Sequence, residues 1–568
     1  MLRMFRTHEI RREEELTERL WEMSVSRGNG ETDRRQALLP GCVQNIPGYE
    51  NYRGQACFET DFISGGGRIR IVCKGVSHTA RVFVDGRDLG GHYNAYTPFA
   101  VWAGRLAPGT HRLRIEADNR WSAQSALHVP NDYESYLGIT RPVAVEETGD
   151  VFIEYLHLTP RKQEGTWRAD AEAEIRNLDG TPFEGSVTLR LGGAEHRTEI
   201  RLAGNESRIV RWEGLEVPDA REWSPEDPQL TAASAVIRGG DGTPEDDLIE
   251  RFGLRQVETR GREILLNGRP VRIRGFCRHE DDPQFGCAVP AAAMARDLAL
   301  IRDMGGNSVR TSHYPNDERF LDLCDETGIL VWEENHARGL SEQQMRNPEF
   351  ECQAEECIRE MIRAHYNHPC IYIWGILNEC ASETEYGRDC YKRQLGLIRS
   401  LDGTRPRSYA SCKWKEDRCF GLADVAAFNM YPRWYIDRPV RDYLEELYAW
   451  IRTAGGEGKP FLVTETGAGA LYGFRTPRHE KWSEEYQRDA LEEQLEAVLD
   501  FEACSGVYIW QFADCRVCDE WFASRPRTMN NKGVVDEYRR PKLAYETVRR
   551  IFRQDEGTER QDGRRTGR

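Results

Sequence analysis

The sequence has no long hydrophobic run and no excess of positive charge. Nowhere do about 18 apolar residues follow one another, and the opening stretch "MLRMFRTHEIRREEEL" lacks the apolar core of a signal peptide. We therefore expect a cytoplasmic protein without a membrane partner. The formal net charge of −16 also argues against a nucleic-acid partner, since phosphate binding requires a basic surface.

The sequence also lacks the pattern of a disulfide frame or of a metal site. Sixteen cysteines in a chain of 568 residues without a signal peptide are expected to be free thiols. One CxxC spacing occurs, from Cys515 to Cys518, but no second pair of cysteines or histidines follows at zinc-finger spacing. We therefore expect no metal and no cofactor.

Apolar and polar residues alternate through much of the first half of the chain, which is too long for a single core. Between about residues 55 and 145, segments such as "RIRIVCKG" and "HRLRIEAD" alternate with period two between turns, which is typical of a β-sandwich. Six or seven further strands, from "DVFIEYLHLTP" to "ASAVIRGG", fit an immunoglobulin-like sandwich. These patterns place domains at 1–148 and 149–256.

The pattern changes after residue 257, where short apolar runs alternate with amphipathic helical stretches. Eight such runs in about 300 residues predict a (β/α)8 barrel over residues 257–552. The runs are 271–277, 307–313, 329–334, 371–377, 407–412, 425–432, 461–465 and 506–512. Residues 553–568 contain no apolar side chain and are expected to form a disordered tail.

Two glutamates follow or end predicted barrel strands. The run "IYIWGIL" is followed by Asn378 and Glu379, and the seventh run ends in Glu465. Active sites on this fold lie at the carboxyl ends of the strands, and strands four and seven lie roughly across the barrel from one another. Two such carboxylates can hydrolyse a glycosidic bond, one as an acid and the other as a supporting or attacking group.

Other barrel chemistries fit the strand ends less well. Each glutamate could instead be the structural ion-pair partner of an arginine at the barrel rim. A metal-dependent hydrolase would need two close histidines after the first strand, where only His279 occurs. No lysine ends any of the eight runs, which argues against Schiff-base chemistry. The pair of glutamates therefore favours a glycosidase.

Four blocks of sequence carry a resemblance to a known family. In order, they are "RGFCRHEDDPQFG" (274–286), "GNSVRTSHYP" (306–315), "NHPCIYIWGILNE" (367–379) and "VTETGAG" (463–469). They resemble the signatures of glycoside hydrolase family 2, the β-galactosidase and β-glucuronidase group, and the resemblance covers about residues 20–552. It implies a jelly-roll-like sugar-binding domain, an immunoglobulin-like domain and a catalytic barrel, in that order.

The resemblance also implies roles for individual residues. The family hydrolyses with retention, so Glu379 is expected to be the general acid/base and Glu465 the nucleophile of a covalent glycosyl-enzyme. Asn378 is expected to donate to the 2-hydroxyl of the sugar, and His313 of the second block is expected to contact substrate.

Further matches point to the uronide-hydrolysing members of the family. "NNKG" carries Asn530 and Lys532, which resemble the Asn-x-Lys pair with which β-glucuronidases hold the sugar carboxylate. By the same resemblance, Trp510 is expected to lie under the sugar ring. Three more residues are expected to bind its hydroxyls, namely Asp132, Tyr431 and Tyr435.

The chain departs from the family pattern after the third barrel strand. The segment "EENHARGLSEQQMRNPEF" is shorter than the corresponding loop of some glucuronidases, which indicates a more open mouth. Arg338 is an extra cation near this rim, and "YPRWY" adds Arg433 where an uncharged residue is expected. An arginine that reaches the pocket could contact an axial 4-hydroxyl, so β-galacturonides become possible substrates beside β-glucuronides. The alternative for Arg338 is a salt bridge with Glu333 or Glu334.

The sequence therefore predicts a retaining exo-β-uronidase, expected as a homo-oligomer. A neutral-sugar β-galactosidase remains an alternative, and the pair Asn530 and Lys532 distinguishes the two. A catalytically silent carbohydrate-binding protein is a third possibility, against which both glutamates argue.

Overall fold

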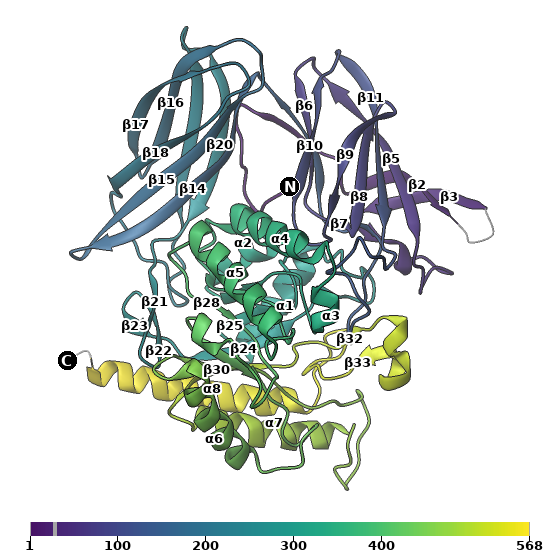
Figure 1. Ribbon diagram of the computed structural model, residues 1–568, viewed down its shortest axis with the longest axis vertical. Coiled ribbons are helices and arrows are strands. Elements are labelled where there is room, and N and C mark those ends of the chain that lie inside the picture. The colour runs from purple at the N-terminus through teal and green to yellow at the C-terminus, as the bar shows by residue number, and fades with distance from the viewer. Residues whose placement is uncertain (1, 27–30, 567–568) are drawn as a thin grey trace.

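The computed structural model describes residues 2–26 and 31–566, arranged as two β-sandwiches beside a helix-covered barrel (Figure 1). The two sandwiches lie next to each other, and the barrel lies below both of them in this view. No helix in the described part of the chain is long and apolar enough to cross a membrane. The predicted β-sandwiches and (β/α)8 barrel are confirmed.

The first sandwich packs two antiparallel sheets. One sheet has the order β1 (Arg12–Glu15), β13 (Val143–Thr148), β6 (Arg68–Cys73), β10 (Phe99–Arg105). The other has the order β3 (Thr32–Leu39), β2 (Arg19–Ser26), β5 (Gln55–Ser64), β11 (Gly109–Asp118), β8 (Thr79–Val84), β9 (Arg87–Tyr93). Alternate residues of the central strands, such as β5, β6 and β11, form its core, as the period-two pattern predicts. The sandwich also includes strands before residue 55, ahead of the alternating segments that predict it.

Short strands at the edge of the first sandwich approach the barrel. β4 (Gly41–Cys42), β12 (Gly138–Ile139) and β7 (Val76–Ser77) form a small sheet of their own. The loop of residues 129–136 precedes β12, and it carries Asn131 and Asp132.

The second sandwich has the seven strands of an immunoglobulin-like unit. One sheet contains β14 (Val151–Gln163), β15 (Thr166–Asn177) and β18 (Ser207–Glu216). The other contains β17 (Ala194–Leu202), β16 (Phe183–Leu191), β19 (Thr231–Gly239) and β20 (Pro244–Phe252). A small sheet of β21 (Val257–Arg260), β22 (Glu263–Leu266) and β23 (Arg269–Pro270) leads into the barrel.

All eight predicted barrel strands are present and parallel. They are β24 (Ile273–Arg278), β25 (Ser308–Thr311), β26 (Leu330–Glu334), β27 (Ile371–Ile376), β28 (Arg407–Tyr409), β29 (Ala426–Asn429), β30 (Phe461–Thr466) and β31 (Cys504–Ile509). Their sheet begins at β28 and ends at β29, and a single bridge between Ser411 and Phe428 closes the barrel. Strands buried on both faces need continuous apolar runs, which explains the sequence pattern.

Helices cover the outside of the barrel. They are α1 (Ala291–Asp303), α2 (Glu318–Thr327), α3 (Glu342–Met345), α4 (Phe350–His365), α5 (Glu385–Leu401), α6 (Val440–Ile451), α7 (Glu484–Leu499) and α8 (Ala544–Thr566). α2 shows how local sequence sets their ends. The Asp317 side chain accepts from the backbone of Arg319 at the start of the helix, and Gly328 ends it at a φ of 73°.

The last helix covers residues 553–566 of the segment expected to form a tail, and residues 567–568 lie outside the described part of the chain. α8 continues through Thr566, along the barrel and toward the carboxyl terminus in Figure 1. Its buried residues Ile551 and Phe552 anchor it, and Asp555 pairs with Arg272 and Arg274 at 3.3 and 2.9 Å. Because arginine, glutamine and glutamate favour helix, the backbone can continue from this anchor without apolar side chains.

Candidate active site

The predicted catalytic glutamates lie at the carboxyl ends of β27 and β30. All six residues of β27 are buried, and the chain turns just beyond it, where Leu377 and Glu379 have φ angles of 48° and 54°. Non-glycine residues rarely hold this left-handed conformation, and when they do, the surrounding structure enforces it. The turn presents Asn378 and Glu379 at the mouth of the barrel.

Glu465 is buried, and both of its carboxylate oxygens accept hydrogen bonds. Nη1 of Arg310 donates to Oε1 at 2.8 Å, and the hydroxyl of Tyr431 donates to Oε2 at 2.6 Å. Burial first, and then the charge of Glu379, raises the pKa of Glu465 to about 7, while Arg310 and Tyr431 act in the opposite direction. Because two donors that keep their protons occupy both oxygens, the hydrogen bonds favour the ionised form of Glu465.

Glu379 occupies a more open position than Glu465. Its side chain is 19% exposed, Nδ2 of Asn429 donates to its Oε1 at 2.9 Å, and Nη2 of Arg338 lies 3.7 Å from its Oε2. The carboxyl group of Glu379 is thus more accessible than that of Glu465, whose side chain is buried.

Arg310 links the buried residues beneath the two glutamates. Its guanidinium donates to both oxygens of Glu334 at 3.0 Å and to Oδ1 of Asn378 at 2.7 Å, besides its bond to Glu465. A buried cation is stable only when such partners satisfy its donors, and the planar fork of arginine suits several acceptors at once. Nδ1 of His313 lies 2.7 Å from Glu334.

We call this set the floor of the pocket; it consists of Arg310, His313, Glu334, Asn378, Asn429 and Glu465. Every member of the floor is buried. The Nδ2 amide of Asn378 has no partner among the residues that the structure describes, so it is available to donate to a bound molecule.

The rim of the pocket, in contrast, is built from loops of two domains. We define it as Asn131, Asp132, Arg338, Tyr435 and Arg525. Oδ1 of Asn131 accepts from Nη1 of Arg338 at 2.6 Å, which joins the first sandwich to the loop after β26. Asp132 accepts from Nε and Nη2 of Arg525 at 2.8 and 2.5 Å and from Nδ2 of Asn530 at 3.0 Å.

The long loop after β31 is held in place by a short hairpin. β32 (Cys515–Arg516) pairs with β33 (Met529–Asn530), and this pairing brings Asn530 beside Asp132. Arg525 lies on the connection between them. Sequence reasoning missed Arg525 and Asn131, because neither belongs to a strand end or to a recognised motif.

Lys532 lies against a group of aromatic rings and is 3% exposed. Its Nζ is 5.9, 5.7 and 5.2 Å from the ring centres of Tyr431, Trp434 and Tyr435, within the range of cation–π attraction. Although burial acts in the opposite direction, the charge of Lys532 lowers the pKa of Tyr435. The structure shows no ion pair for Lys532 within residues 2–26 and 31–566, so this buried ammonium lacks an anionic partner.

The remaining predicted site residues also gather at this mouth. Trp510 stacks on His313 with ring centres 5.0 Å apart and meets the ring of His279 edge-on at 5.4 Å. Tyr435 has one of the more exposed aromatic side chains of the described chain and stands at the outer edge of the pocket.

The two extra arginines have different positions. Arg338 does not pair with Glu333 or Glu334, because Glu333 binds His365 and Glu334 binds Arg310 and His313. It lies instead between Asn131 and Glu379, facing the pocket. Arg433 pairs with Glu493 at 3.1 Å on the surface, so the structure does not place it in the pocket.

Three buried histidines lie behind the rim, where the first sandwich meets the barrel. The ring of His128 is 4.3 Å from the rings of both His78 and His336. Burial lowers the pKa of all three, to about 4 for His78 and about 3 for His336. Each ring also has one nitrogen without a partner in the described part of the chain, so the cluster stays neutral near pH 7.

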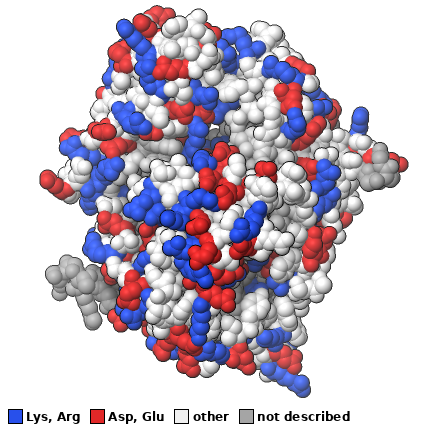
Figure 2. Space-filling model, viewed as in Figure 1, with Lys and Arg blue, Asp and Glu red and all other residues white. Residues whose placement is uncertain are grey.

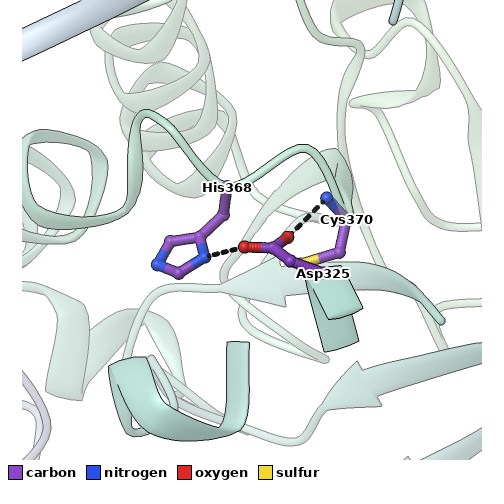
Figure 3. A group of neighbouring side chains, drawn as sticks. All are labelled: Asp325, His368 and Cys370. Atoms are coloured by element: carbon purple, nitrogen blue, oxygen red, sulfur yellow. Dashed lines mark hydrogen bonds and ion pairs between the residues drawn. The ribbon is translucent and has the colours of Figure 1, made fainter. Parts of the chain in front are cut away.

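Two groups of described side chains have the composition of a metal site: Asp325, His368 and Cys370, and His8, Glu13 and Glu146. The contacts of the first group are structural. Figure 3 shows His368 and the backbone of Cys370 converging on Asp325, which bonds them at 2.6 and 3.0 Å. The thiol of Cys370 donates to the Leu321 carbonyl, and the guanidinium of Arg3 lies 3.4 Å from Nε2 of His368. A cation next to the only free ring nitrogen disfavours a metal ion here.

One large cleft lies away from the glutamates. It has a volume of about 920 Å³ and lies at the amino-terminal ends of the barrel strands, beside Arg274, Asn307 and Ile329. Acidic and basic side chains line it in equal number, and Figure 2 shows the two signs similarly interspersed on one face of the molecule. This end of a barrel serves stability rather than catalysis.

A (β/α)8 barrel that presents two glutamates from different strand ends has the machinery of a glycoside hydrolase. Comparison with known families agrees. Residues 257–554 match the model "Glycosyl hydrolases family 2, TIM barrel domain", and residues 151–255 match the model "Glycosyl hydrolases family 2". The chain therefore belongs to glycosyl hydrolase family 2.

Individual relatives resemble the whole chain. A crystal structure of a GH2 β-galacturonidase from Eisenbergiella tayi bound to galacturonate shares 58% identity and a TM-score of 0.96, over 98% of this chain and 99% of that one. A β-glucuronidase of Paenibacillus borealis is 26% identical over 542 residues, 87% of each chain. The β-glucuronidase of Homo sapiens is 28% identical over 526 residues, 84% of this chain and 77% of the relative.

Proposed function

We propose that this protein is a retaining, exo-acting β-uronidase that releases terminal β-linked galacturonate or glucuronate. One observation carries the substrate class: Lys532 is a buried cation without an anionic partner in the described chain. Leaving an ammonium unpaired in such a position is costly, and a sugar carboxylate would supply the missing charge. The similarity to a β-galacturonidase and to β-glucuronidases supports this choice.

The reaction proceeds by double displacement. Glu465 attacks the anomeric carbon while Glu379 donates its proton to the leaving oxygen, and the bond between sugar and aglycone breaks. Glu379, now ionised, then takes a proton from water, which attacks the glycosyl-enzyme and releases Glu465. The two hydrogen bonds to Glu465 support its role as the ionised nucleophile, and the open position of Glu379 suits proton transfer.

The sugar is held from the floor and from the rim. The free Nδ2 of Asn378 donates to the 2-hydroxyl, and Trp510, stacked on His313, supports the face of the ring. Tyr431 and Tyr435 contribute phenolic hydroxyls, and Asn530 completes the carboxylate site with Lys532. Asp132 accepts from sugar hydroxyls on the opposite side.

Arg338 directs the enzyme toward β-galacturonides. The two uronates differ only in the orientation of the 4-hydroxyl, and a donor placed for the axial oxygen is left unpaired by the equatorial epimer. Arg338 faces the pocket from the loop after β26, oriented by Asn131. Its planar donors can reach such an axial oxygen.

Hydrolysis of four p-nitrophenyl glycosides tests this function: β-galacturonide, β-glucuronide, β-galactoside and β-glucoside. We expect kcat/KM for the uronides to exceed that for the neutral sugars by about a hundredfold or more, with the galacturonide hydrolysed faster than the glucuronide. Faster hydrolysis of the β-galactoside would identify a neutral-sugar β-galactosidase instead.

We also propose that the protein forms a homo-oligomer through the first sandwich. Leu20 of β2 and Leu38 of β3 are cross-strand partners, and both are exposed, as is Ile63 of the adjacent strand β5. Adjacent exposed aliphatic side chains favour an interface. Light scattering should give the mass of an oligomer for the unaltered protein and a smaller mass for Leu38→Lys; a monomer in both cases would refute the proposal.

A cytoplasmic location is proposed as well. All sixteen cysteines are unpaired, which suits a reducing compartment. Cell fractionation followed by an activity assay tests this, and recovery in the extracellular fraction would contradict it.

A further inference from the structure

Asn429 lies at the end of β29, between the two residues that β27 presents. Its Nδ2 donates to Oε1 of Glu379 at 2.9 Å and to Oδ1 of Asn378 at 3.2 Å. Its Oδ1 accepts from the hydroxyl of Thr464 at 2.8 Å. Asn429 and Thr464 are both buried, and Thr464 immediately precedes Glu465. One side chain of strand six is thus hydrogen-bonded to the ends of strands four and seven.

The acceptors on strand four set which way the amide of Asn429 points. With the amide reversed, its oxygen would face Oε1 of Glu379 and Oδ1 of Asn378, and the latter already accepts from Arg310. A hydroxyl can donate or accept, and in the observed orientation that of Thr464 donates to Oδ1 of Asn429. Thr464 therefore supports Asn429 as a donor toward strand four.

This donor decides where Glu379 can carry its proton. Oε1 of Glu379 accepts the N–H of Asn429, so in the acid form the proton resides on Oε2. Oε2 is the oxygen that faces Arg338, at 3.7 Å from its Nη2. The same donor, together with Arg310, occupies Oδ1 of Asn378 and leaves Nδ2 as the group turned toward a substrate.

We propose that Asn429 and Thr464 form a positioning pair that places the acid/base proton of Glu379 on Oε2 and orients the amide of Asn378. This inference rests on the proposed function, since it assigns the geometry of that acid. Neither residue needs to touch the sugar. They act through Glu379 and Asn378.

Other groups also face Glu379 and remain in place when Asn429 is changed. They are Arg338 from the loop after β26, Cys380, which follows Glu379 in the chain, Cys412 after β28, Tyr431 after β29 and Glu465 on β30. Because these groups are common to every variant below, differences between variants report on Asn429 and Thr464.

The test is the pH profile of kcat/KM on whichever p-nitrophenyl glycoside the unaltered enzyme hydrolyses best. Its basic limb reports the loss of the proton from the general acid. Asn429→Ala removes a donor that favours the ionised carboxylate, so we expect the limb to move about one pH unit upward. Asn429→Asp also adds a negative charge, so it should move the basic limb further upward than Asn429→Ala does. Thr464→Val should move the limb less than Asn429→Ala does.

Thr466→Val is the matched control. Thr466 lies two residues along the same strand, is equally buried, and its hydroxyl has no partner in the described chain. Thr466→Val should therefore leave the basic limb of the pH profile unchanged. Thr464→Ser, which keeps the hydroxyl, should restore the profile.

Leaving-group dependence gives a second readout. With a 2,4-dinitrophenyl glycoside, which needs little acid assistance, Asn429→Ala should lose less than about threefold in kcat, whereas an unactivated phenyl glycoside should lose tenfold or more. Equal losses on both, or an unmoved limb, would show that the pair is merely structural. If the unaltered enzyme hydrolyses none of the glycosides, the proposed function is overturned, and this inference with it.

Discussion

The floor and the rim of the pocket differ in how they are built. The floor comes from the ends of barrel strands, is buried throughout, and is joined by Arg310 into one hydrogen-bonded set. The rim comes from loops, and Asp132 and Arg525 are 393 residues apart in the chain. Strands position groups more rigidly than loops do. The floor therefore suits the chemistry of the family, and the rim suits the choice of sugar.

Among the changes to the floor, replacing the nucleophile should cause the largest loss of activity. We expect Glu465→Gln to lose roughly four or more orders of magnitude in kcat and to form no covalent intermediate with a 2-fluoro glycoside, because an amide cannot attack the anomeric carbon. Mass spectrometry of the labelled peptide measures this.

Glu379→Gln, which changes the other glutamate, is compared with Glu465→Gln. It should still trap intermediate when the leaving group is activated, since such a group departs without a proton. A label on any residue other than Glu465 in the unaltered enzyme would refute the assignment of the nucleophile.

Lys532→Ala should lose at least about a hundredfold in kcat/KM on uronides, with far less loss on the matching neutral hexosides. The substrate carboxylate would then be desolvated without a partner, at a cost of about 2–5 kcal/mol. Lys481→Ala is the matched control, because Lys481 also lies over the ring of Trp434, at 5.4 Å, but has its own partner in the Trp434 carbonyl. Equal losses on charged and neutral sugars would make Lys532 structural.

A change at the rim should alter selectivity more than rate. We expect Arg338→Ala to shift the ratio of kcat/KM values toward the glucuronide by about tenfold, the effect of one charged hydrogen bond of about 1.5–3 kcal/mol. Parallel assays on both uronides give the ratio. An unchanged ratio would leave Arg338 as a structural partner of Asn131 and Glu379, without a role in choosing the epimer.

The smallest effect concerns the histidines behind the rim. Their pKa values are lowered below about 6.5, so the unfolded chain binds more protons as the pH falls through this value, and stability is lost on acidification. One such histidine accounts for about 0.8 kcal/mol between pH 8 and pH 6. His128→Gln should reduce the pH dependence of the free energy of unfolding by this amount, as urea titration measures; an unchanged slope would contradict it.

The sequence predicts part of the floor (His313, Asn378 and Glu465) and part of the rim (Asp132, Arg338 and Tyr435), but on different physical grounds. Buried parallel strands need continuous apolar runs, and these runs point directly to Asn378, Glu379 and Glu465 at their ends. No comparable periodicity marks a loop, so Arg525 and Asn131 become visible only when two domains are docked. The position of Arg338 depends in the same way on Asn131, a residue 207 positions away.

The loop of residues 129–136 also bears on how such an enzyme can diversify. It belongs to a domain that folds around its own core, yet it delivers Asn131 and Asp132 to the mouth of another. An exchange of this short segment between related genes would present the same catalytic glutamates with a new set of hydroxyl partners. Exchange of this loop alone would therefore change the accepted sugar without any substitution in the barrel.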